Sequence, residues 1–310
     1  MLGGISAIAL NTYREAVRAR ILLGLGALAL GTALYSIAVG EFALRNAPRV
    51  VADLGAASIS LYALVVAIVI AATSLYRELE QKTIFPILAR PISRTEYLIG
   101  KYLGTLLTLA VFIAADAAVI LFILAVHGGK SPITVVATAL GLVGSLALVA
   151  WRVPRLRTYG PIPWAAAALA IAWIMSSGAV DDRRVVLGTS ILTLLEVAVV
   201  CAIATVFSSF SSPFLSAVFT IGIWLVGRSA DTLGKLPARV FGETIKSIGA
   251  FLSKIVPNLQ FYVPPRTLLT GELPGTSLTT YIGLAALQSV ALSAALLVFA
   301  SLIFRRRDFL

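Results

Sequence analysis

Three ionisable residues, Asp116, Glu196 and Arg228, stand inside long apolar segments of the chain. An ionisable side chain at the centre of a membrane helix costs about 2.5–3.5 kcal/mol, so each needs a partner or a function. Depth along the helices, at about 1.5 Å per residue, predicts an ion pair between Asp116 and Arg228. The alternative is that these side chains line a polar path. Glu196 has no basic residue at its predicted depth, so we expect it to be protonated, hydrogen-bonded to another span or turned toward such a path.

Other residue types that carry out chemistry are scarce. The chain has one cysteine and one histidine, so we expect no disulfide framework, no metal site and no cofactor bound by this chain. The nucleotide-binding motif G-x-x-x-x-G-K-[ST] is absent. Its nearest approach, Gly129-Lys-Ser131, has leucine at position 124 where the motif needs glycine, so we expect a turn there. The chain is therefore expected to have no ATPase activity and no catalytic residues.

Composition indicates that these residues lie in a membrane. Of the 310 residues, 59% are hydrophobic and only 13% are charged, and the mean hydropathy is +0.97. Soluble domains have about 45–50% apolar and about 25% charged residues. We therefore predict an all-α, polytopic helix bundle that forms a single domain over residues 1–310. Eight segments are long and apolar enough to span: Ile21–Gly40, Leu54–Leu75, Tyr102–Val126, Ile133–Trp151, Pro163–Ala179, Val186–Phe207, Pro213–Ala230 and Tyr281–Phe304.

The basic residues orient the predicted bundle. Eight spans place both termini on one side, and that side carries 14 of the 25 Lys and Arg residues: Arg14, Arg18, Arg20, Arg77, Lys82, Arg90, Arg94, Lys101, Arg152, Arg155, Arg157, Arg305, Arg306 and Arg307. Basic residues in short loops stay in the cytoplasm, so both termini are expected there, in the plasma membrane. The net charge of +11 then reflects topology and contact with anionic lipid, not a nucleic-acid partner. The apolar run from Ile21 is too long for a signal peptide, so we expect a retained span.

Residues 1–20 are predicted to form an interfacial helix. On a helical wheel, Asn11, Arg14, Glu15 and Arg18 share one face, and apolar residues including Tyr13 fill the remainder. Such a helix lies along the cytoplasmic membrane surface with its charges toward water. A simple N-terminal anchor is the alternative.

Residues 76–101 form the predicted cytoplasmic loop between the second and third spans. The run Ile84–Ala89 is apolar although it lies on the water side, and Pro91 closes it. Ser93 and Glu96 have the spacing of a capping box, which starts the next helix. An exposed apolar run must either pack on the ends of the spans or dock into a partner, and the residues leave both possibilities open.

Residues 231–280 form a long external loop. Within it, Phe241–Val256 places Ile245, Ile248 and Phe251 on one face and charged residues on the other. This pattern predicts a helix at the outer membrane interface. The helix either shapes an exit for cargo or covers the bundle without touching cargo.

Several stretches resemble the permease subunits of type 2 ATP-binding-cassette exporters. The closest group is that of permeases for multicopper-enzyme maturation and copper processing. The similar stretches are Asn11–Leu22, Glu78–Lys101 with its Ala89-Arg-Pro-Ile-Ser-Arg94 and Leu98-Ile-Gly-Lys-Tyr-Leu-Gly104, Pro257–Gln260 and Phe304–Phe309. The resemblance covers residues 5–126 and roughly 186–310.

The resemblance implies a permease driven by a separate cytoplasmic ATPase, which would bind ATP and Mg. A second permease copy, identical or related, would complete the path. A coupling helix in the 76–101 loop would dock into the ATPase through Glu78, Glu80, Thr83, Ile84, Phe85, Pro86, Ile87, Leu88, Arg90 and Pro91. The interfacial helix, with Tyr13, Arg14, Glu15 and Arg18, would lie beside it.

The chain departs from the resemblance at residues 133–180. Relatives have six spans, so these residues add two, for which peripheral packing is expected over a role with substrate. Two further classes of function stay open beside the exporter permease: a secondary transporter or channel without an ATPase, and an intramembrane enzyme or scaffold. The sequence does not identify a substrate.

Overall fold

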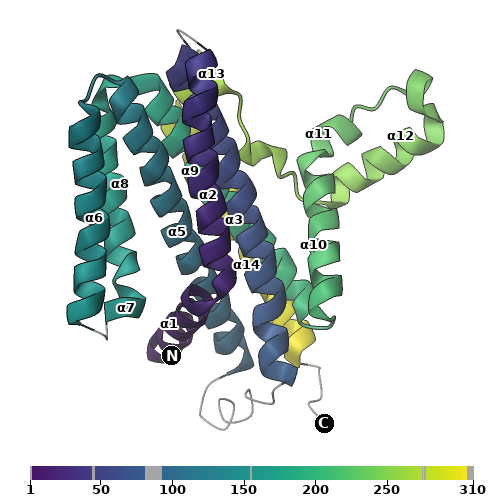
Figure 1. Ribbon diagram of the computed structural model, residues 1–310. Helices are drawn as coiled ribbons and strands as arrows, with labels where there is room; N and C mark the ends of the chain where they lie inside the picture. The colour runs from purple at the N-terminus through teal and green to yellow at the C-terminus, as the bar shows by residue number, and fades with distance from the viewer. Residues whose placement is uncertain are drawn as a thin grey trace.

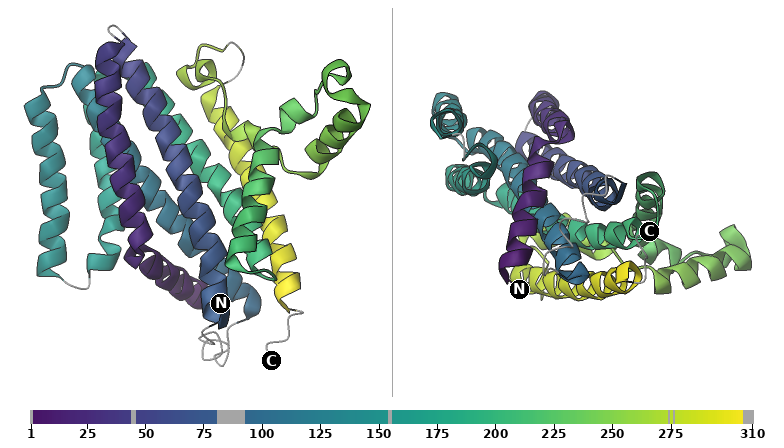
Figure 2. Two further views of the ribbon diagram at one scale, coloured as in Figure 1. Left: turned by 45° about the vertical axis from the view of Figure 1, so that its right-hand side comes forward. Right: turned by 90° about the horizontal axis from the view of Figure 1, so that it is seen from below.

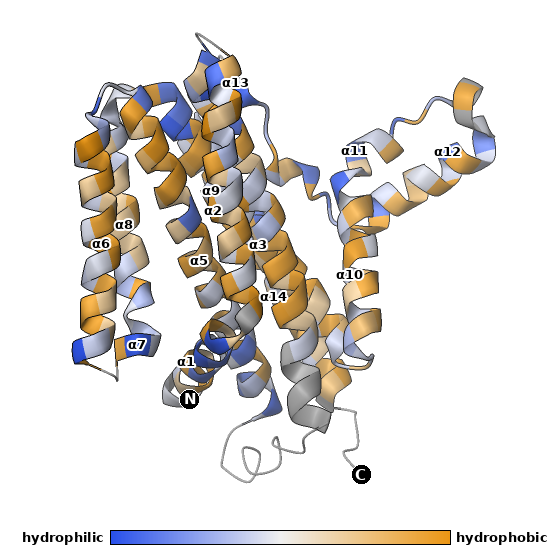
Figure 3. Cartoon of the chain, in the orientation of Figure 1, coloured by the Kyte–Doolittle hydropathy of each residue, from blue (hydrophilic) through white to orange (hydrophobic). Residues whose placement is uncertain are grey.

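A computed structural model describes residues 2–43, 46–80, 93–153, 156–273, 275 and 277–305. These residues form helices and connecting turns, with no strand among them (Figure 1). Seven helices are long and apolar enough to cross a membrane, and one further apolar helix, α10, is shorter. Apolar residues cover most of their length (Figure 3). The predicted all-α, polytopic bundle is confirmed.

In chain order, the helices are α1 (Leu2–Arg18), α2 (Arg20–Phe42), α3 (Ala47–Glu80), α5 (Arg94–His127), α6 (Pro132–Arg152), α7 (Leu156–Tyr159), α8 (Pro161–Met175), η2 (Ser176–Gly178), α9 (Val180–Ser208), α10 (Pro213–Arg228), α11 (Ala230–Leu233), α12 (Ala238–Ile255), η3 (Gln260–Tyr262), α13 (Arg266–Thr270) and α14 (Leu278–Arg305).

The long helices run between two ends of the bundle (Figure 1). One end, called the α1 end, holds α1, the start of α5, α7, the turn between α9 and α10, and the end of α14. The other, called the α13 end, holds α13 and the turns that follow α2 and α5. Because α1 and the end of α14 share one end, the chain passes along the bundle an even number of times, and α10 supplies one of these passes.

Helix α9 forms the centre of the bundle. About 78% of its most apolar window is buried, compared with 6% for α6. It packs against α3, α5 and α14, and its sequence is apolar on every side, as a fully enclosed helix requires. Small residues such as Ala202 and Ala204, both fully buried, allow the neighbouring helices to approach closely.

Helices α6 and α8 form a hairpin at the edge of the bundle (Figure 2). Helix α8 packs on α5 through its buried alanines Ala165, Ala168 and Ala172. Helix α6 lies outside α8 and has one buried residue, Val135. This position agrees with the peripheral packing expected for residues 133–180. That these residues add two spans to those of related permeases stays a prediction.

Helix α10 differs from the predicted span Pro213–Ala230. It ends at Arg228 after 16 residues, which is about 24 Å and short of the 30 Å hydrocarbon layer. The chain then folds over the helix end, where the Leu259 amide donates to the Gly227 carbonyl at 3.0 Å. A Cβ atom at Gly227 would lie 2.8 Å from the Pro257 carbonyl oxygen, so a larger residue would keep this segment away from the helix end.

The amphipathic helix predicted within residues 231–280 is present as α12, and its external position stays a prediction. Its backbone breaks at Gly242, where φ is 80°, and it stands out sideways from the bundle (Figures 1 and 2). Ile245, Ile248 and Phe251 are all exposed, whereas Gly249 on another face packs on the Leu233 carbonyl of α11. The exposed apolar face agrees with a position at the outer membrane interface. Both predicted roles for this helix, shaping an exit for cargo or covering the bundle, stay open.

The first prediction concerns the two ends. Single cysteines at Lys130 and Asp181, near turns of the α13 end, should react with an impermeant maleimide on intact cells, because that end is expected outside. Cysteines at Arg157 and Phe210, at the α1 end, should react only after permeabilisation. The buried native Cys201 is first replaced by alanine. Labelling at position 157 from outside would show that α6 and α8 do not cross the membrane.

Candidate functional site

The predicted coupling residues lie at or beyond the end of α3. Glu78 and Glu80 belong to its last turns, and only their backbone is described. Residues 81–92, which include Thr83, Ile84, Phe85, Pro86, Ile87, Leu88, Arg90 and Pro91, lie outside the described residues. The coupling assignment therefore stays a prediction. Its immediate surroundings at the α1 end are described, and they show how this end is held together.

Helix α1 packs directly on the first turns of α5 through two glycines. A Cβ atom at Gly104 would lie 2.6 Å from the Thr12 Cβ and closer still to the Ala9 carbonyl oxygen, and one at Gly100 would lie 2.7 Å from the Ile8 Cβ. The two backbones are therefore closer than any side chain at these positions would permit. Gly100 and Gly104 have the G-x-x-x-G spacing of close helix contacts in membranes. The spacing was visible in the sequence, but its partner helix was not.

A buried ammonium group reinforces this contact. The Lys101 side chain is only 7% exposed. Its Nζ lies 3.8 Å from the Glu15 Oε2 and 5.8 Å from the centre of the Tyr97 ring. Arg14, Glu15 and Arg18 are exposed, which confirms the predicted charged face of α1.

The opposite face of α1 is covered by protein. Tyr13 and Ala16 are buried, because this side of the helix packs on α5. The Tyr13 ring lies nearly parallel to the Tyr159 ring of α7, with 6.5 Å between their centres. Burial raises the pKa of Tyr13 to about 12, so its hydroxyl stays neutral. Helix α1 therefore connects the α6–α8 hairpin to α5.

The first turn of α5 has the predicted capping box. The Glu96 amide donates to the Ser93 Oγ at 3.2 Å, and the Ser93 amide donates to the Glu96 Oε2 at 2.9 Å. Two further bonds join this turn to the end of α14: Thr95 Oγ1 lies 2.7 Å from Ser301 Oγ, and Arg94 Nη1 donates to the Phe304 carbonyl at 3.2 Å. The start of α5 is therefore fixed on one side by α1 and on the other by α14.

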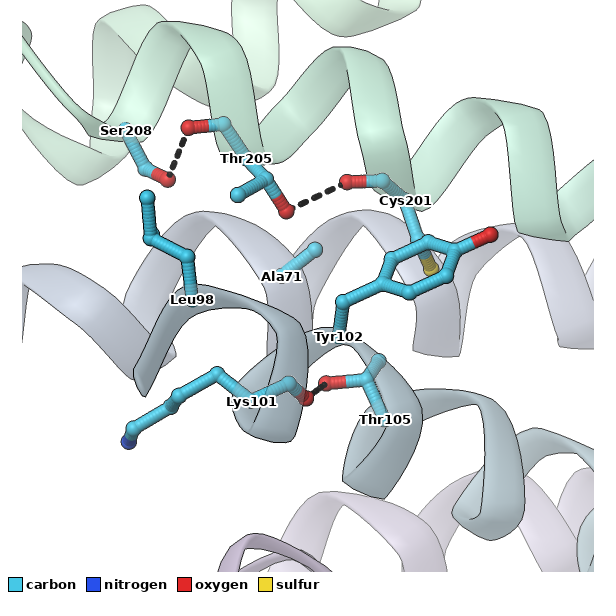
Figure 4. Close-up of a pocket in the computed structure, with 8 residues that line it drawn as sticks. All are labelled: Ala71, Leu98, Lys101, Tyr102, Thr105, Cys201, Thr205 and Ser208. Carbon is cyan, nitrogen blue, oxygen red and sulfur yellow. Dashed lines mark hydrogen bonds between the residues drawn. The ribbon is translucent and has the colours of Figure 1, made fainter. Parts of the chain in front are cut away.

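A small cavity lies between α3, α5 and α9 near the α1 end (Figure 4). Its volume of about 20 Å³ has room for about one water molecule. The hydroxyls of Thr105, Thr205 and Ser208 donate to carbonyls of their own helices, and the Tyr102 hydroxyl crosses from α5 to the Ala198 carbonyl of α9. The helices are thus closely packed here, and this cavity offers no passage for a larger molecule.

An ion pair inside the bundle joins α9 to α10. The guanidinium of Arg228 donates to both carboxylate oxygens of Glu196, from Nε at 2.8 Å and from Nη2 at 3.0 Å. The Trp224 Nε1 donates to the same carboxylate at 2.9 Å, and Arg228 Nη2 reaches the Ser60 Oγ of α3 at 3.3 Å. Glu196 is 2% exposed, whereas Arg228 is 24% exposed.

The predicted pair of Asp116 with Arg228 is wrong. Arg228 pairs with Glu196, for which no basic partner was expected, and the Asp116 Oδ2 is buried without a partner among the described residues. Depth along a helix can be estimated from sequence, but the identity of the neighbouring helix cannot. Helix α10 packs mainly on α9 and α3, so Arg228 meets the carboxylate of α9.

The second prediction tests the contact between α1 and α5. Gly104→Leu should lower the melting temperature in detergent, because the side chain would have to occupy the position of the α1 backbone; overpacking costs about 1–3 kcal/mol. A cysteine at Thr12, buried in this contact, should become reactive in the same variant. Gly31→Leu is the matched control, since a Cβ atom there meets nothing within 4 Å. Equal effects of the two changes would contradict the close contact.

The third prediction concerns the ion pair. Arg228→Gln should destabilise the chain by about 3–5 kcal/mol, because it leaves the buried Glu196 carboxylate unpaired. Glu196→Gln should cost less, since Arg228 is partly exposed, and the double variant should be milder than the sum. Asp116→Asn combined with Arg228→Gln should instead be additive. Melting temperatures of the full set check this, and additive losses for Glu196 and Arg228 would exclude their pairing.

Comparison with known proteins gives one family. Residues 18–154, somewhat less than half of the chain, match the family model described as ABC-2 family transporter protein. The matched region runs from the end of α1 through α6. No curated protein matches the chain. Residues 18–154 are thus similar to ABC-2 family transporter proteins, and the seven long apolar helices among the described residues support a multi-pass membrane protein.

Proposed function

We propose that this chain is the transmembrane subunit of an ATP-driven exporter in the plasma membrane, with the α1 end in the cytoplasm and a separate ATPase docked there. The family match to residues 18–154 supports a permease. The single structural observation that carries the proposal is the contact of α1 with Gly100 and Gly104. It packs α5, which follows the proposed docking loop, firmly against α1, which would lie beside that loop.

Movement of the docking loop would be transmitted to the membrane helices through α5 and the helix α1 packed against it. Helix α5 begins shortly after Pro91, and its first turn is bonded to α14 and packed on α1. An ATPase that pulled on the loop would therefore displace α5 together with α1. Only closure of the ATPase, which would bind ATP and Mg, supplies energy in this scheme.

A second copy of the chain, or a related permease, completes the proposed translocation path. The exposed charges of α1, namely Arg14, Glu15 and Arg18, would lie beside the docked ATPase. A relationship to the copper-processing permeases in particular is supported only by the sequence resemblance. With one Cys, one His and two Met, this chain has few of the soft ligands that copper prefers.

The fourth prediction tests the docking loop. Phe85→Ala combined with Leu88→Asp should abolish co-purification with the ATPase, because both residues are expected to fill the apolar contact at the centre of the interface. Affinity purification from native membranes followed by mass spectrometry measures this. Unchanged melting temperature would show that the permease itself stays folded. Phe210→Ala, an exposed phenylalanine at the same end, is the matched control.

Two outcomes would decide against the proposal in different ways. If the double variant binds its ATPase and transports normally, residues 83–91 are not the docking element. If the wild-type chain captures no ATPase from native membranes, the alternative of a secondary transporter or channel becomes the better account.

A further inference from the structure

A cleft of about 430 Å³ opens in the half of the bundle nearer the α13 end. Helices α3, α9 and α10 form its walls, and residues 262–269 cover it. Its volume falls in the range of about 300–1,000 Å³ that is usual for small-molecule sites. Arg266 fixes the cover, because its guanidinium bonds to Asp53 of α3 and to Asp182 of α9.

Polar groups without partners face this cleft. Thr189 and Thr193 of α9 line it, and neither hydroxyl makes a hydrogen bond within the described part of the chain, although Thr193 is only 2% exposed. Most other threonines within the long helices donate to a carbonyl of their own helix, as Thr205 does. Arg228 also lines the cleft, and its Nη1 is the guanidinium nitrogen that Glu196 and Ser60 leave unused. The Thr193 side chain is buried, and buried polar groups nearly always have a hydrogen-bond partner, so the cleft suits a ligand with oxygen acceptors.

The remaining wall of the cleft is apolar. Ala57, Leu61 and Leu64 line it from α3. Leu61 is 55% exposed, so its side chain also belongs to the surface that faces the bilayer. Arg228 lies about 22 Å along α10 from Pro213. With Pro213 at the inner boundary of the hydrocarbon layer, which is about 30 Å thick, Arg228 would lie below the outer boundary. A ligand in this cleft therefore has a polar end near Arg228 and a hydrocarbon part beside α3.

We propose that the cleft between α3, α9 and α10 is a binding site for a phospholipid of the outer leaflet. Phosphate or ester oxygens accept hydrogen bonds from Arg228 Nη1 and the Thr193 hydroxyl, and one acyl chain lies along Ala57, Leu61 and Leu64. The guanidinium of an arginine forms charge-assisted hydrogen bonds with phosphate oxygens. The outer-leaflet assignment rests on the orientation given in the proposed function. The tests of the lipid site need no ATPase, so failure of the lipid site and failure of the ATPase docking can be told apart.

Native mass spectrometry of the detergent-purified chain tests the site. The wild type should retain a phospholipid, and Ala57→Phe, which fills the cleft, should lose it. Thr193→Val should weaken retention about two- to tenfold, as expected for the loss of one hydrogen bond. The same change should leave the melting temperature of the delipidated chain unchanged or raised, since the hydroxyl has no protein partner among the described residues. Thr134→Val, at an exposed threonine of α6, should leave retention unchanged.

Trp224 provides a second measurement in the intact cleft. It lines the site, and Trp151, Trp164 and Trp173 can be replaced by phenylalanine so that it alone emits. In nanodiscs, phosphatidylcholine brominated on one acyl chain should quench Trp224, and Ala57→Phe should reduce the quenching. Leu225→Phe, which changes an exposed neighbour on α10, should not.

The outcomes that overturn the proposal are specific. Absence of retained lipid in the wild type, or equal retention in Ala57→Phe, would exclude a lipid site. Quenching of Trp224 by water-soluble acrylamide, with none by brominated lipid, would show that the cleft is filled with water and open to a polar ligand instead.

Discussion

The carboxylate of Glu196 is the point on which the packing of three helices depends. No water is available in the hydrocarbon layer, so a buried charge must find its partners within the protein. Glu196 on α9 finds two of them on α10, Trp224 and Arg228, and the same guanidinium continues to Ser60 on α3. Because the pair is directional, it fixes the rotation of α10 as well as its distance from α9. Arg228 also lines the cleft between α3, α9 and α10, so the guanidinium that joins these helices forms part of the wall of the cleft.

A second contact gives the α1 end its rigidity by a different means. There the close approach of backbones at Gly100 and Gly104 brings α1 onto α5, and Lys101 and Glu15 add a charge pair at the rim. The capping box at Ser93 and the bonds to α14 hold the first turn of α5. The two ends of the bundle are therefore built differently: one is closely packed, and the other holds a cleft under a covering segment.

The sequence correctly predicted the features that depend on a single helix. The long apolar segments, the capping box at Ser93 and Glu96, the charged face of α1 and the helix around Ile248 all follow from periodicity or local hydrogen bonding, and all are present. The sequence-based prediction was wrong where a contact depends on which two helices are neighbours. Asp116 and Arg228 lie at similar predicted depths. Arg228 nevertheless pairs with Glu196, because α10 packs against α9. The G-x-x-x-G spacing in α5 was readable, but its partner α1 was not. The docking role predicted for residues 83–91 involves a second protein, and these residues lie outside the described ones, so this role stays a prediction.

The length of α5 has a mechanical consequence. Its 34 residues make a rod of about 51 Å, longer than the 40–45 Å of a whole bilayer. No proline interrupts it, and proline is a usual cause of a sharp kink. A continuous helix of this length would carry a displacement at Arg94 along the bundle toward His127. The turn at Gly128 packs tightly on Gly178, the last residue of η2, and α9 begins two residues later. A displacement at the far end of α5 would therefore reach the central helix of the bundle.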